Sequence, residues 1–274
     1  MKKIISLCFL ALLLAGCKPA VIPQVKPENL RILSLVTCAD HIITELGAKD
    51  KIAAIDRHGR VLDSMQDVPV TVAGGMVSRE MLRKYKISHA VIWYYQQNLI
   101  PVFEQEKIGV TVIPPMTSKS YINVVQDLGL LCNKNEEAEK LAAKFRQTIP
   151  EIFPIKHKPV IVYIELYTSW KAPSEVGYIG EMLSYAGGQL AAAGKINGMV
   201  SPEAVALAKP EVIFFVEGFG SVNELAGRPA LRNTPAVKNR KIYAIPRKLV
   251  CEGVAPEELL NFFTDKIKLC SQCE

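Results

Sequence analysis

The stretch RILSLVTCADHIITELGAKDKIAAIDR, residues 31–57, decides the fold of this chain. Two apolar runs, at residues 32–36 and 52–55, flank a segment in which apolar side chains recur three, four and seven residues apart. These side chains are Ala39, Ile42, Ile43 and Leu46. Their spacing predicts an amphipathic helix between two buried strands, and we expect Thr37 to cap this helix and Gly47 to end it.

The same alternation continues through the rest of the chain. Five further short runs are rich in β-branched residues and alternate with helical stretches. They are residues 90–93, 110–113, 160–164, 212–216 and 242–245. Strands of parallel sheets, covered on both faces, have this continuous apolar character. The predicted fold class is therefore α/β, with mainly parallel central sheets.

A regular amphipathic helix is predicted for residues 135–149, near the middle of the chain. Pro150, Pro154 and Pro159 follow it and a new strand begins after them. We interpret this helix as one long rod that joins two lobes. The predicted divisions are an N-terminal lobe at residues 30–132, a linker helix at 133–155 and a C-terminal lobe at 156–274.

The two predicted lobes contain a weak internal repeat. Residues 78–93 match residues 201–216 at an offset of 123, which keeps a Ser, a Glu and a Lys in register. In each copy the Ser is placed to cap a helix, and Glu80 or Glu203 lies in the first turn, where a carboxylate complements the helix dipole. The repeat suggests a duplicated architecture.

The N-terminus has the composition of an export signal. Positive charge at Lys2 and Lys3 precedes an apolar run at residues 4–14, which is too short to span a bilayer. The run ends in Leu14-Ala15-Gly16-Cys17, which resembles the lipobox of bacterial lipoproteins. We expect residues 1–16 to be a lipoprotein signal peptide, Cys17 to be lipidated and residues 17–29 to form a tether. The alternative is a cleaved secretory peptide with an incidental Cys.

Charge and cysteine usage narrow the function classes. The net charge is +6 without a dense basic tract, so no nucleic-acid partner is expected. The chain has seven Cys, of which Cys8 lies in the predicted signal and Cys17 is the predicted anchor. The remaining five cannot all pair within one chain. The pattern Cys270-Ser271-Gln272-Cys273 has no second pair at metal-ligand spacing, so it is a weak zinc signal.

Several segments together carry a resemblance to a known family. They are residues 31–35, 45–52, 55–57, 127–129, 186–188, 201–203 and 209–213. In their order and spacing, the chain resembles the substrate-binding lipoproteins of ABC importers for ferric siderophores, haem and cobalamin. The resemblance implies a monomer with two α/β lobes joined by a helix. It also implies that Glu80 and Glu203 dock the protein on Arg residues of an ABC permease dimer, although each could be only a first-turn carboxylate.

The ligand site is expected where the parallel strands end, because open α/β sheets bind ligands beyond the carboxyl ends of their strands. Six aromatic residues fall on these loops and suit a large planar ligand. They are Trp93, Tyr94, Tyr95, Tyr167, Trp170 and Phe219. For Trp93, which ends an apolar strand, a place in the core is an equal alternative.

Basic and metal-ligating side chains fall on or beside the same loops. Arg57, Lys171 and Arg247 could bind an anionic chelate, or could be solvated surface charges. His58 and Tyr95 are candidate axial ligands for haem iron.

Cys38 and Cys251 depart from the family pattern, and three interpretations compete for them. They could be inert buried thiols, soft metal ligands, or a disulfide that clamps the lobes.

The sequence favours an extracytoplasmic solute-binding lipoprotein that captures a metal chelate, above all a ferric siderophore, and delivers it to an ABC permease. Cobalamin or another corrinoid, or haem, is the alternative ligand. A bare divalent metal would need several convergent His and carboxylate ligands, but only His58 of the four His lies on a cleft loop. A surface enzyme is the third hypothesis, and no catalytic motif supports it. We expect no catalytic residue and no cofactor, and a location in the cell envelope facing outside the cytoplasm.

Overall fold

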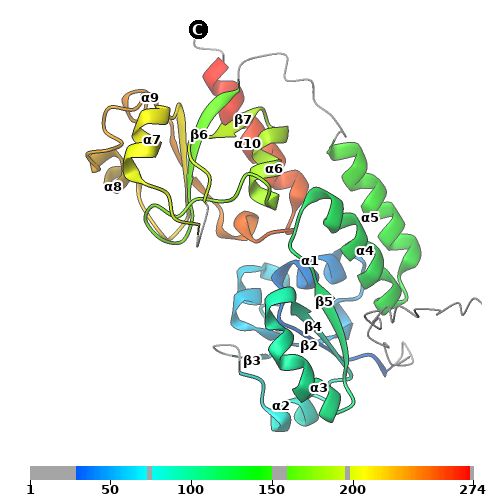
Figure 1. Ribbon diagram of the computed structural model, residues 1–274. Coiled ribbons are helices and arrows are strands. Elements are labelled where there is room, and N and C mark those ends of the chain that lie inside the picture. Colours follow the sequence, from blue (N-terminus) through cyan, green and yellow to red (C-terminus); the bar gives the residue numbers. More distant parts are fainter. Residues whose placement is uncertain (1–28, 73–75, 150–158, 195–197, 272–274) are drawn as a thin grey trace, which may run out of the picture.

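The computed structural model describes residues 29–72, 76–149, 159–194 and 198–271. The predicted signal peptide, Cys17 and almost all of the tether lie outside these residues. The described chain folds into two α/β lobes, each built on one parallel sheet (Figure 1). The predicted fold class is therefore confirmed.

The N-terminal lobe has a five-stranded sheet in the order β3-β2-β1-β4-β5. Its strands are β1 (Ile32–Ser34), β2 (Ile52–Asp56), β3 (Val70–Val72), β4 (His89–Trp93) and β5 (Gly109–Ile113). Its helices are α1 (Thr37–Glu45), α2 (Arg79–Lys84), α3 (Ile100–Gln105) and α4 (Ser118–Cys132). Strand β1 pairs in parallel with β2, so the predicted strand–helix–strand unit is confirmed.

Helix α1 begins one residue earlier than the cap prediction implies. Val36 occupies the N-cap position with extended backbone angles and offers no side-chain hydrogen bond, while Thr37 is already helical. The prediction that Thr37 caps the helix is therefore wrong. Gly47 does lie at the end of the helix, where its φ of +70° is one that glycine adopts without strain.

The C-terminal lobe has a four-stranded sheet in the order β7-β6-β8-β9. Its strands are β6 (Val160–Glu165), β7 (Gly188–Leu190), β8 (Val212–Val216) and β9 (Ile242–Ile245). Its helices are α6 (Tyr178–Tyr185), α7 (Pro202–Ala208), α8 (Val222–Gly227), α9 (Pro235–Lys238) and α10 (Pro256–Ser271).

The internal repeat has a structural counterpart. Strands β4 and β8 are separated by the predicted offset of 123 residues, and each pairs with the first strand of its lobe. Helices α2 and α7 precede them at the same offset. The Ser201 hydroxyl accepts a hydrogen bond from the Ala204 amide at 3.1 Å, whereas Ser78 stands at the equivalent N-cap without such a bond.

The predicted linker helix is α5 (Asn135–Thr148), which packs along α4 (Figure 1). The close approach of the two helices requires Gly129, because a Cβ there would collide with Ala138. An ion pair of 2.6 Å from Lys144 to Glu257 joins α5 to α10 of the C-terminal lobe. Residues 150–158 of the predicted linker lie outside the described residues.

The two lobes also contact each other directly, at one end of the gap between them. A continuous core cluster includes residues of both sheets, and a Cβ added to Gly253 would lie 3.0 Å from the Cβ of Cys38. This packing fixes one end of the gap between the lobes. Within the described ranges, no helix has the length and apolar character needed to cross a bilayer.

Candidate functional site

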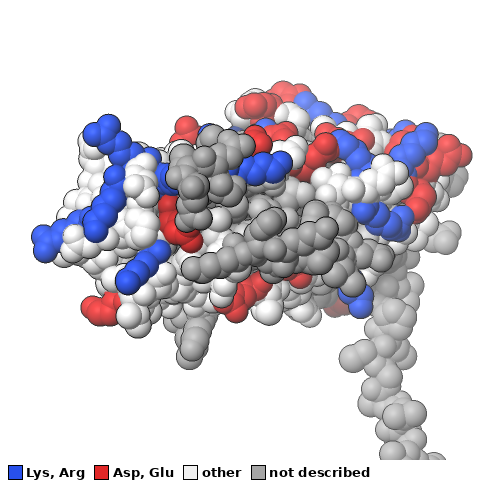
Figure 2. Space-filling view, turned by 90° about the horizontal axis from the view of Figure 1, so that it is seen from above, with Lys and Arg blue, Asp and Glu red and all other residues white. Residues whose placement is uncertain are grey.

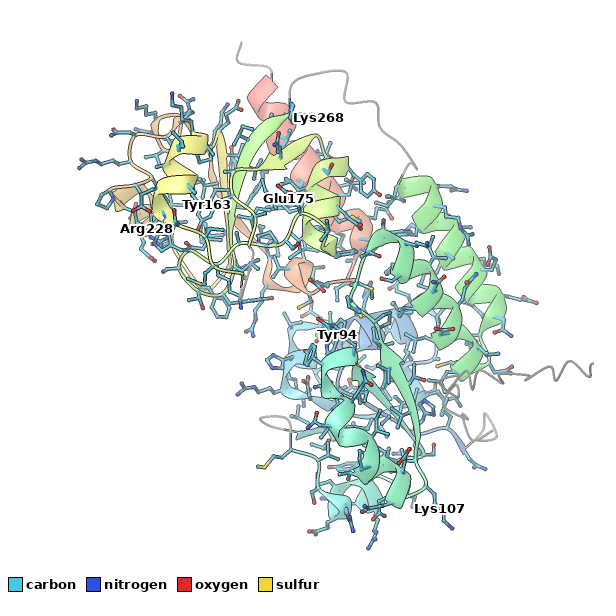
Figure 3. All side chains as sticks on the ribbon, in the orientation of Figure 1. Tyr94, Lys107, Tyr163, Glu175, Arg228 and Lys268 are labelled. Carbon is cyan, nitrogen blue, oxygen red and sulfur yellow. The ribbon has the colours of Figure 1, made fainter. Side chains whose placement is uncertain are left out.

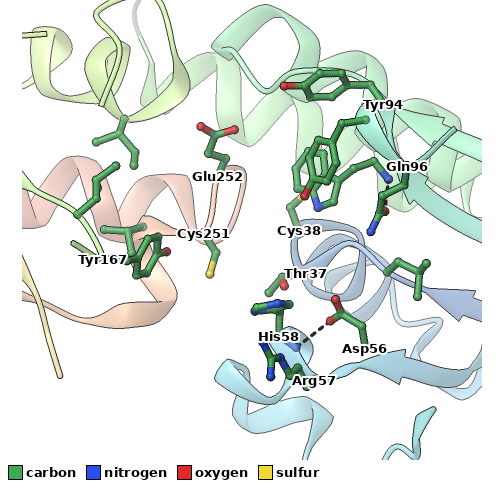
Figure 4. Close-up of a pocket in the computed structure, with 16 residues that line it drawn as sticks. Thr37, Cys38, Asp56, Arg57, His58, Tyr94, Gln96, Tyr167, Cys251 and Glu252 are labelled. Atoms are coloured by element: carbon green, nitrogen blue, oxygen red, sulfur yellow. Dashed lines mark hydrogen bonds between the residues drawn. The ribbon is translucent and has the colours of Figure 1, made fainter. Parts of the chain in front are cut away.

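A cavity of about 600 Å³ lies between the two lobes, where strands of both sheets end (Figure 4). Its volume is in the range of small-molecule sites. The N-terminal lobe contributes residues that follow β1, β2 and β4, and the C-terminal lobe contributes residues that follow β6 and β9. The lining consists of Leu35, Thr37, Cys38, Asp56, Arg57, His58, Trp93, Tyr94, Tyr95, Gln96, Leu166, Tyr167, Ile179, Val250, Cys251 and Glu252.

Aromatic rings from both lobes line this cleft. On the N-terminal side, Trp93 and Tyr95 stack with their centroids 6.2 Å apart, and Tyr94 meets Tyr95 edge to face at 5.3 Å. Tyr167 lies on the opposite wall. Trp93 is half-buried. It packs against the core with one part of its surface and lines the cleft with another, so it belongs to both the core and the pocket. The rings offer flat apolar surfaces to a ligand.

Four other predicted ligand residues do not line the cleft. Phe219 lies against Tyr167, with ring centroids 5.0 Å apart, and the Arg247 guanidinium lies 5.3 Å from the Phe219 ring. They support the C-terminal wall without forming it. Trp170 has a φ of +62° and packs 5.9 Å from the Tyr163 ring, in a different surface depression that also contains Glu203. Lys171 likewise lies outside the cleft lining.

A buried ion pair positions the loop that carries Tyr167. The Glu165 carboxylate ends β6 and accepts hydrogen bonds from the Tyr163 hydroxyl, the Trp170 amide and both terminal nitrogens of Arg228. Tyr163 and Arg228 are labelled in the C-terminal lobe in Figure 3. The Arg228 guanidinium also lies 5.1 Å from the Trp170 ring. These contacts fold the segment after β6 back on the sheet, so that Tyr167 projects into the cleft.

The cleft lining contains two carboxylates, although the sequence analysis named only basic side chains as charged candidates. The Asp56 carboxylate accepts hydrogen bonds from the backbone amides of His58 at 2.8 Å and Gly59 at 3.2 Å, and so orders the turn that carries Arg57. Glu252, which the sequence reasoning missed, faces the same space from the C-terminal lobe. Partial burial raises the pKa of both carboxyl groups.

Glu252 could have been found from its position. It follows the short turn after β9, at the same sheet edge as the predicted loops.

The two unusual cysteines both line the cleft, Cys38 from α1 and Cys251 from the opposite lobe. Both are free thiols, and Cys38 is fully buried. Burial raises the pKa of Cys38 well above its usual range and that of Cys251 to about 11. A raised pKa lowers the fraction of reactive thiolate, which agrees with the interpretation of both residues as inert thiols.

His58 lies next to Arg57 in the turn after β2, lines the cleft and is exposed. In the described part of the chain, no group of three or more His, Cys, Asp and Glu is placed to hold a metal ion. A bare metal therefore has no ready-made cage among these residues.

A buried carboxyl group lies behind the floor of the cleft. Asp40 in α1 has no exposed surface, and neither of its oxygens has a hydrogen-bond partner among the described residues. Burial raises its pKa well above the usual range. A Cβ on Gly59 would lie 2.8 Å from an Asp40 oxygen, so this side chain lies directly beneath the turn that carries Arg57 and His58.

The two predicted docking residues, Glu80 and Glu203, lie on the surface of the protein. Glu80 and Glu203 are both exposed, in the first turns of α2 and α7. On the face in Figure 2, Lys and Arg mostly alternate with Asp and Glu, although several basic side chains gather at one end.

Comparison with known proteins agrees with this architecture. The family model described as periplasmic binding protein matches residues 32–249. No curated protein sequence matches the chain. Among solved structures, the chain is similar to a possible iron-binding, periplasmic solute-binding protein from Staphylococcus epidermidis, at 18% identity and a TM-score of 0.71, over 87% of this chain and 98% of that one.

Two proteins of Vibrio cholerae are similar to the same degree. The periplasmic vitamin B12 binding protein BtuF has 19% identity and a TM-score of 0.71, over 89% of this chain and 98% of its own. The periplasmic heme binding protein HutB has 18% identity and a TM-score of 0.73, over 89% of this chain and 99% of its own. At these identities the likeness establishes a shared fold.

Proposed function

The chain belongs to the periplasmic binding protein family, whose members bind solutes and do not convert them, and we propose that it captures a metal chelate for an ABC importer. The observation that carries this proposal is the cleft between the lobes, with aromatic rings on both walls. Flat rings and a few polar groups suit a large chelate, which buries apolar surface on binding. The structural neighbours with iron, vitamin B12 and heme in their descriptions add support.

Three classes of chelate are candidates: a ferric siderophore, which the sequence favours, a corrinoid and haem. Calorimetric titration of the detergent-solubilised full chain with a ferric tris-hydroxamate, a ferric tris-catecholate, cyanocobalamin and haemin tests the proposal. We expect saturable binding of one class with a Kd in the micromolar range or below, which corresponds to about −8 kcal/mol or better. Absence of binding by all four probes would refute the proposal.

We propose that delivery uses Glu80 and Glu203, which lie at equivalent positions of the repeated unit, one on each lobe. Paired acidic side chains can orient the protein on basic residues of a permease dimer. The double variant Glu80→Lys/Glu203→Lys should lose transport in cells and keep its chelate affinity. Glu136→Lys, an exposed reversal on α5, is the matched control. Transport by the double variant equal to the control would count against the docking role.

We also propose that Cys17 anchors the protein to a membrane through acyl chains and holds it near the permease. Tethering raises the effective concentration of the loaded protein at its partner. Metabolic labelling with a tagged fatty acid should mark the wild-type chain and leave Cys17→Ser unmarked. Equal labelling of both chains would remove the anchor from this account.

A further inference from the structure

The charges around the cleft bear on which chelate it accepts. Among the lining residues, Asp56 and Glu252 supply two carboxylates and Arg57 is the one Lys or Arg. Arg247 lies just behind the wall, beside Phe219, and Lys248 is already engaged with Glu258 at 2.7 Å. When Arg247 is counted, acidic and basic groups near the cleft balance, so the cavity has no positive excess to offer an anion.

The two carboxylates also have acceptor capacity that the protein does not use. Asp56 binds the two backbone amides through Oδ1, and no described residue donates to its Oδ2. The Glu252 carboxylate has neither a hydrogen bond nor an ion pair within the described chain. Asp56 is half-buried and Glu252 is exposed, and both line the cleft, so their free oxygens are open to a bound ligand. A ligand that donates N–H groups to these oxygens would form charge-assisted hydrogen bonds, which are stronger than neutral ones.

A highly anionic chelate would meet the opposite situation. Its negative oxygens would approach the carboxylates of Asp56 and Glu252, whose charge already offsets that of Arg57 and of Arg247 behind the wall, so no basic group is left over to pair with the ligand. Like charges brought together at a desolvated interface cost several kcal/mol as a general rule and exclude the wrong partner. Aromatic walls, by contrast, do not penalise a neutral or cationic ligand, and their faces attract cations.

We infer, resting on the proposed function, that the cleft selects chelates of neutral or positive net charge, and that Glu252 and Asp56 are the residues that determine this specificity by accepting hydrogen bonds from ligand amide or ammonium groups. Ferric tris-hydroxamates and corrinoid amides belong to this class. Ferric tris-catecholates, which carry several negative charges, do not. The ferric siderophore favoured by the sequence is thereby narrowed to one without negative charge.

The test compares ligands that share a scaffold and differ in charge. The detergent-solubilised full chain is titrated calorimetrically with ferrioxamine B, which carries an ammonium group, with its neutral N-acetyl derivative and with its anionic N-succinyl derivative. Cyanocobalamin and a monocarboxylate derived from it form the parallel corrinoid series. Haemin and a ferric tris-catecholate complete the set as anionic chelates.

We expect the anionic member of the bound series to bind about tenfold weaker than the neutral one, because its added negative charge lies near the carboxylates of Asp56 and Glu252. In Glu252→Gln this difference in affinity between the neutral and the anionic ligand, the affinity gap, should shrink, because the amide has a similar shape and no charge. Glu136→Gln, an exposed change on α5, should keep the wild-type gap. Asp56→Asn provides a second variant, and the wild-type series alone tests the inference if a variant fails to fold.

Each outcome separates the inference from the proposed function. If the anionic member of a bound series binds as tightly as the neutral one, or more tightly, the charge selection is overturned and chelate capture stays intact. The same follows if the affinity gap is unchanged in both Glu252→Gln and Asp56→Asn. Tight binding of haemin or the tris-catecholate in preference to every neutral chelate would do the same. No binding by any probe would overturn the proposed function, and the charge selection with it.

Discussion

Replacing Arg228 by Met should destabilise the C-terminal lobe more than any surface ion-pair change. The side chain of Glu165 is 1% exposed and that of Arg228 13%, and the two form a two-pronged pair, with Arg228 Nη2 to Glu165 Oε1 at 2.9 Å. Arg228→Met keeps a long apolar stem but removes both donors. Glu165 then keeps only the Tyr163 hydroxyl and the Trp170 amide as donors to a buried negative charge.

The magnitude follows from the burial of the pair. Removing one partner of a buried ion pair typically costs about 3–5 kcal/mol, because the remaining charge is uncompensated. The double variant Glu165→Gln/Arg228→Met removes that charge and keeps an acceptor for the two remaining donors. It should recover most of the loss. Hydrogen bonding to Glu165 raises the pKa of Arg228, consistent with a strong pair.

The assay is urea unfolding followed by circular dichroism, with the chelate affinity measured on the folded variants. Arg83→Met is the matched control, because Arg83 makes a two-pronged pair with Glu106 while its side chain is 72% exposed. An exposed pair contributes about 1 kcal/mol or less. If Arg228→Met loses no more stability than Arg83→Met, the reasoning about this buried pair is refuted.

Two further predictions concern buried ionisable groups. Because burial raises the pKa of Asp40, its ionisation costs stability, so wild-type stability should fall relative to Asp40→Asn as pH rises above about 4. Asp40→Asn should gain about 1–3 kcal/mol at pH 7 in urea unfolding, and an equal or lower stability would contradict this account. Because burial raises the pKa of Cys38 and Cys251, both should react with iodoacetamide at pH 8 more slowly than the same thiols in urea. Equal rates in the folded and unfolded chain would show that the thiols are not protected.

Much of the fold could be predicted from periodicity, and what was missed has a physical reason. The apolar runs predicted β1, β2, β4, β5, β6, β8 and β9. Strands β3 and β7 escaped because each is an edge strand of three residues, which is too short to show a period. The cap of α1 was misassigned because Val36 satisfies no amide with its side chain and leaves no chemical signal.

The site was predictable where a loop directly follows a strand, as for Tyr95 and Tyr167. It was not predictable where tertiary contacts redirect the chain. Trp170 lies on a predicted cleft loop, but the Glu165 and Arg228 network turns its ring toward Tyr163 and away from the cleft. Such a network joins residues 63 positions apart and has no local sequence pattern.

The chain has two Trp, and they report directly on the central claim that the ligand binds between the lobes. Trp93 lines the cleft and Trp170 lies outside it. Titration of Trp170→Phe and Trp93→Phe with the bound chelate should quench the fluorescence of Trp93 strongly and that of Trp170 far less. Strong quenching of Trp170 with Trp93 unaffected would place the ligand elsewhere and contradict the account.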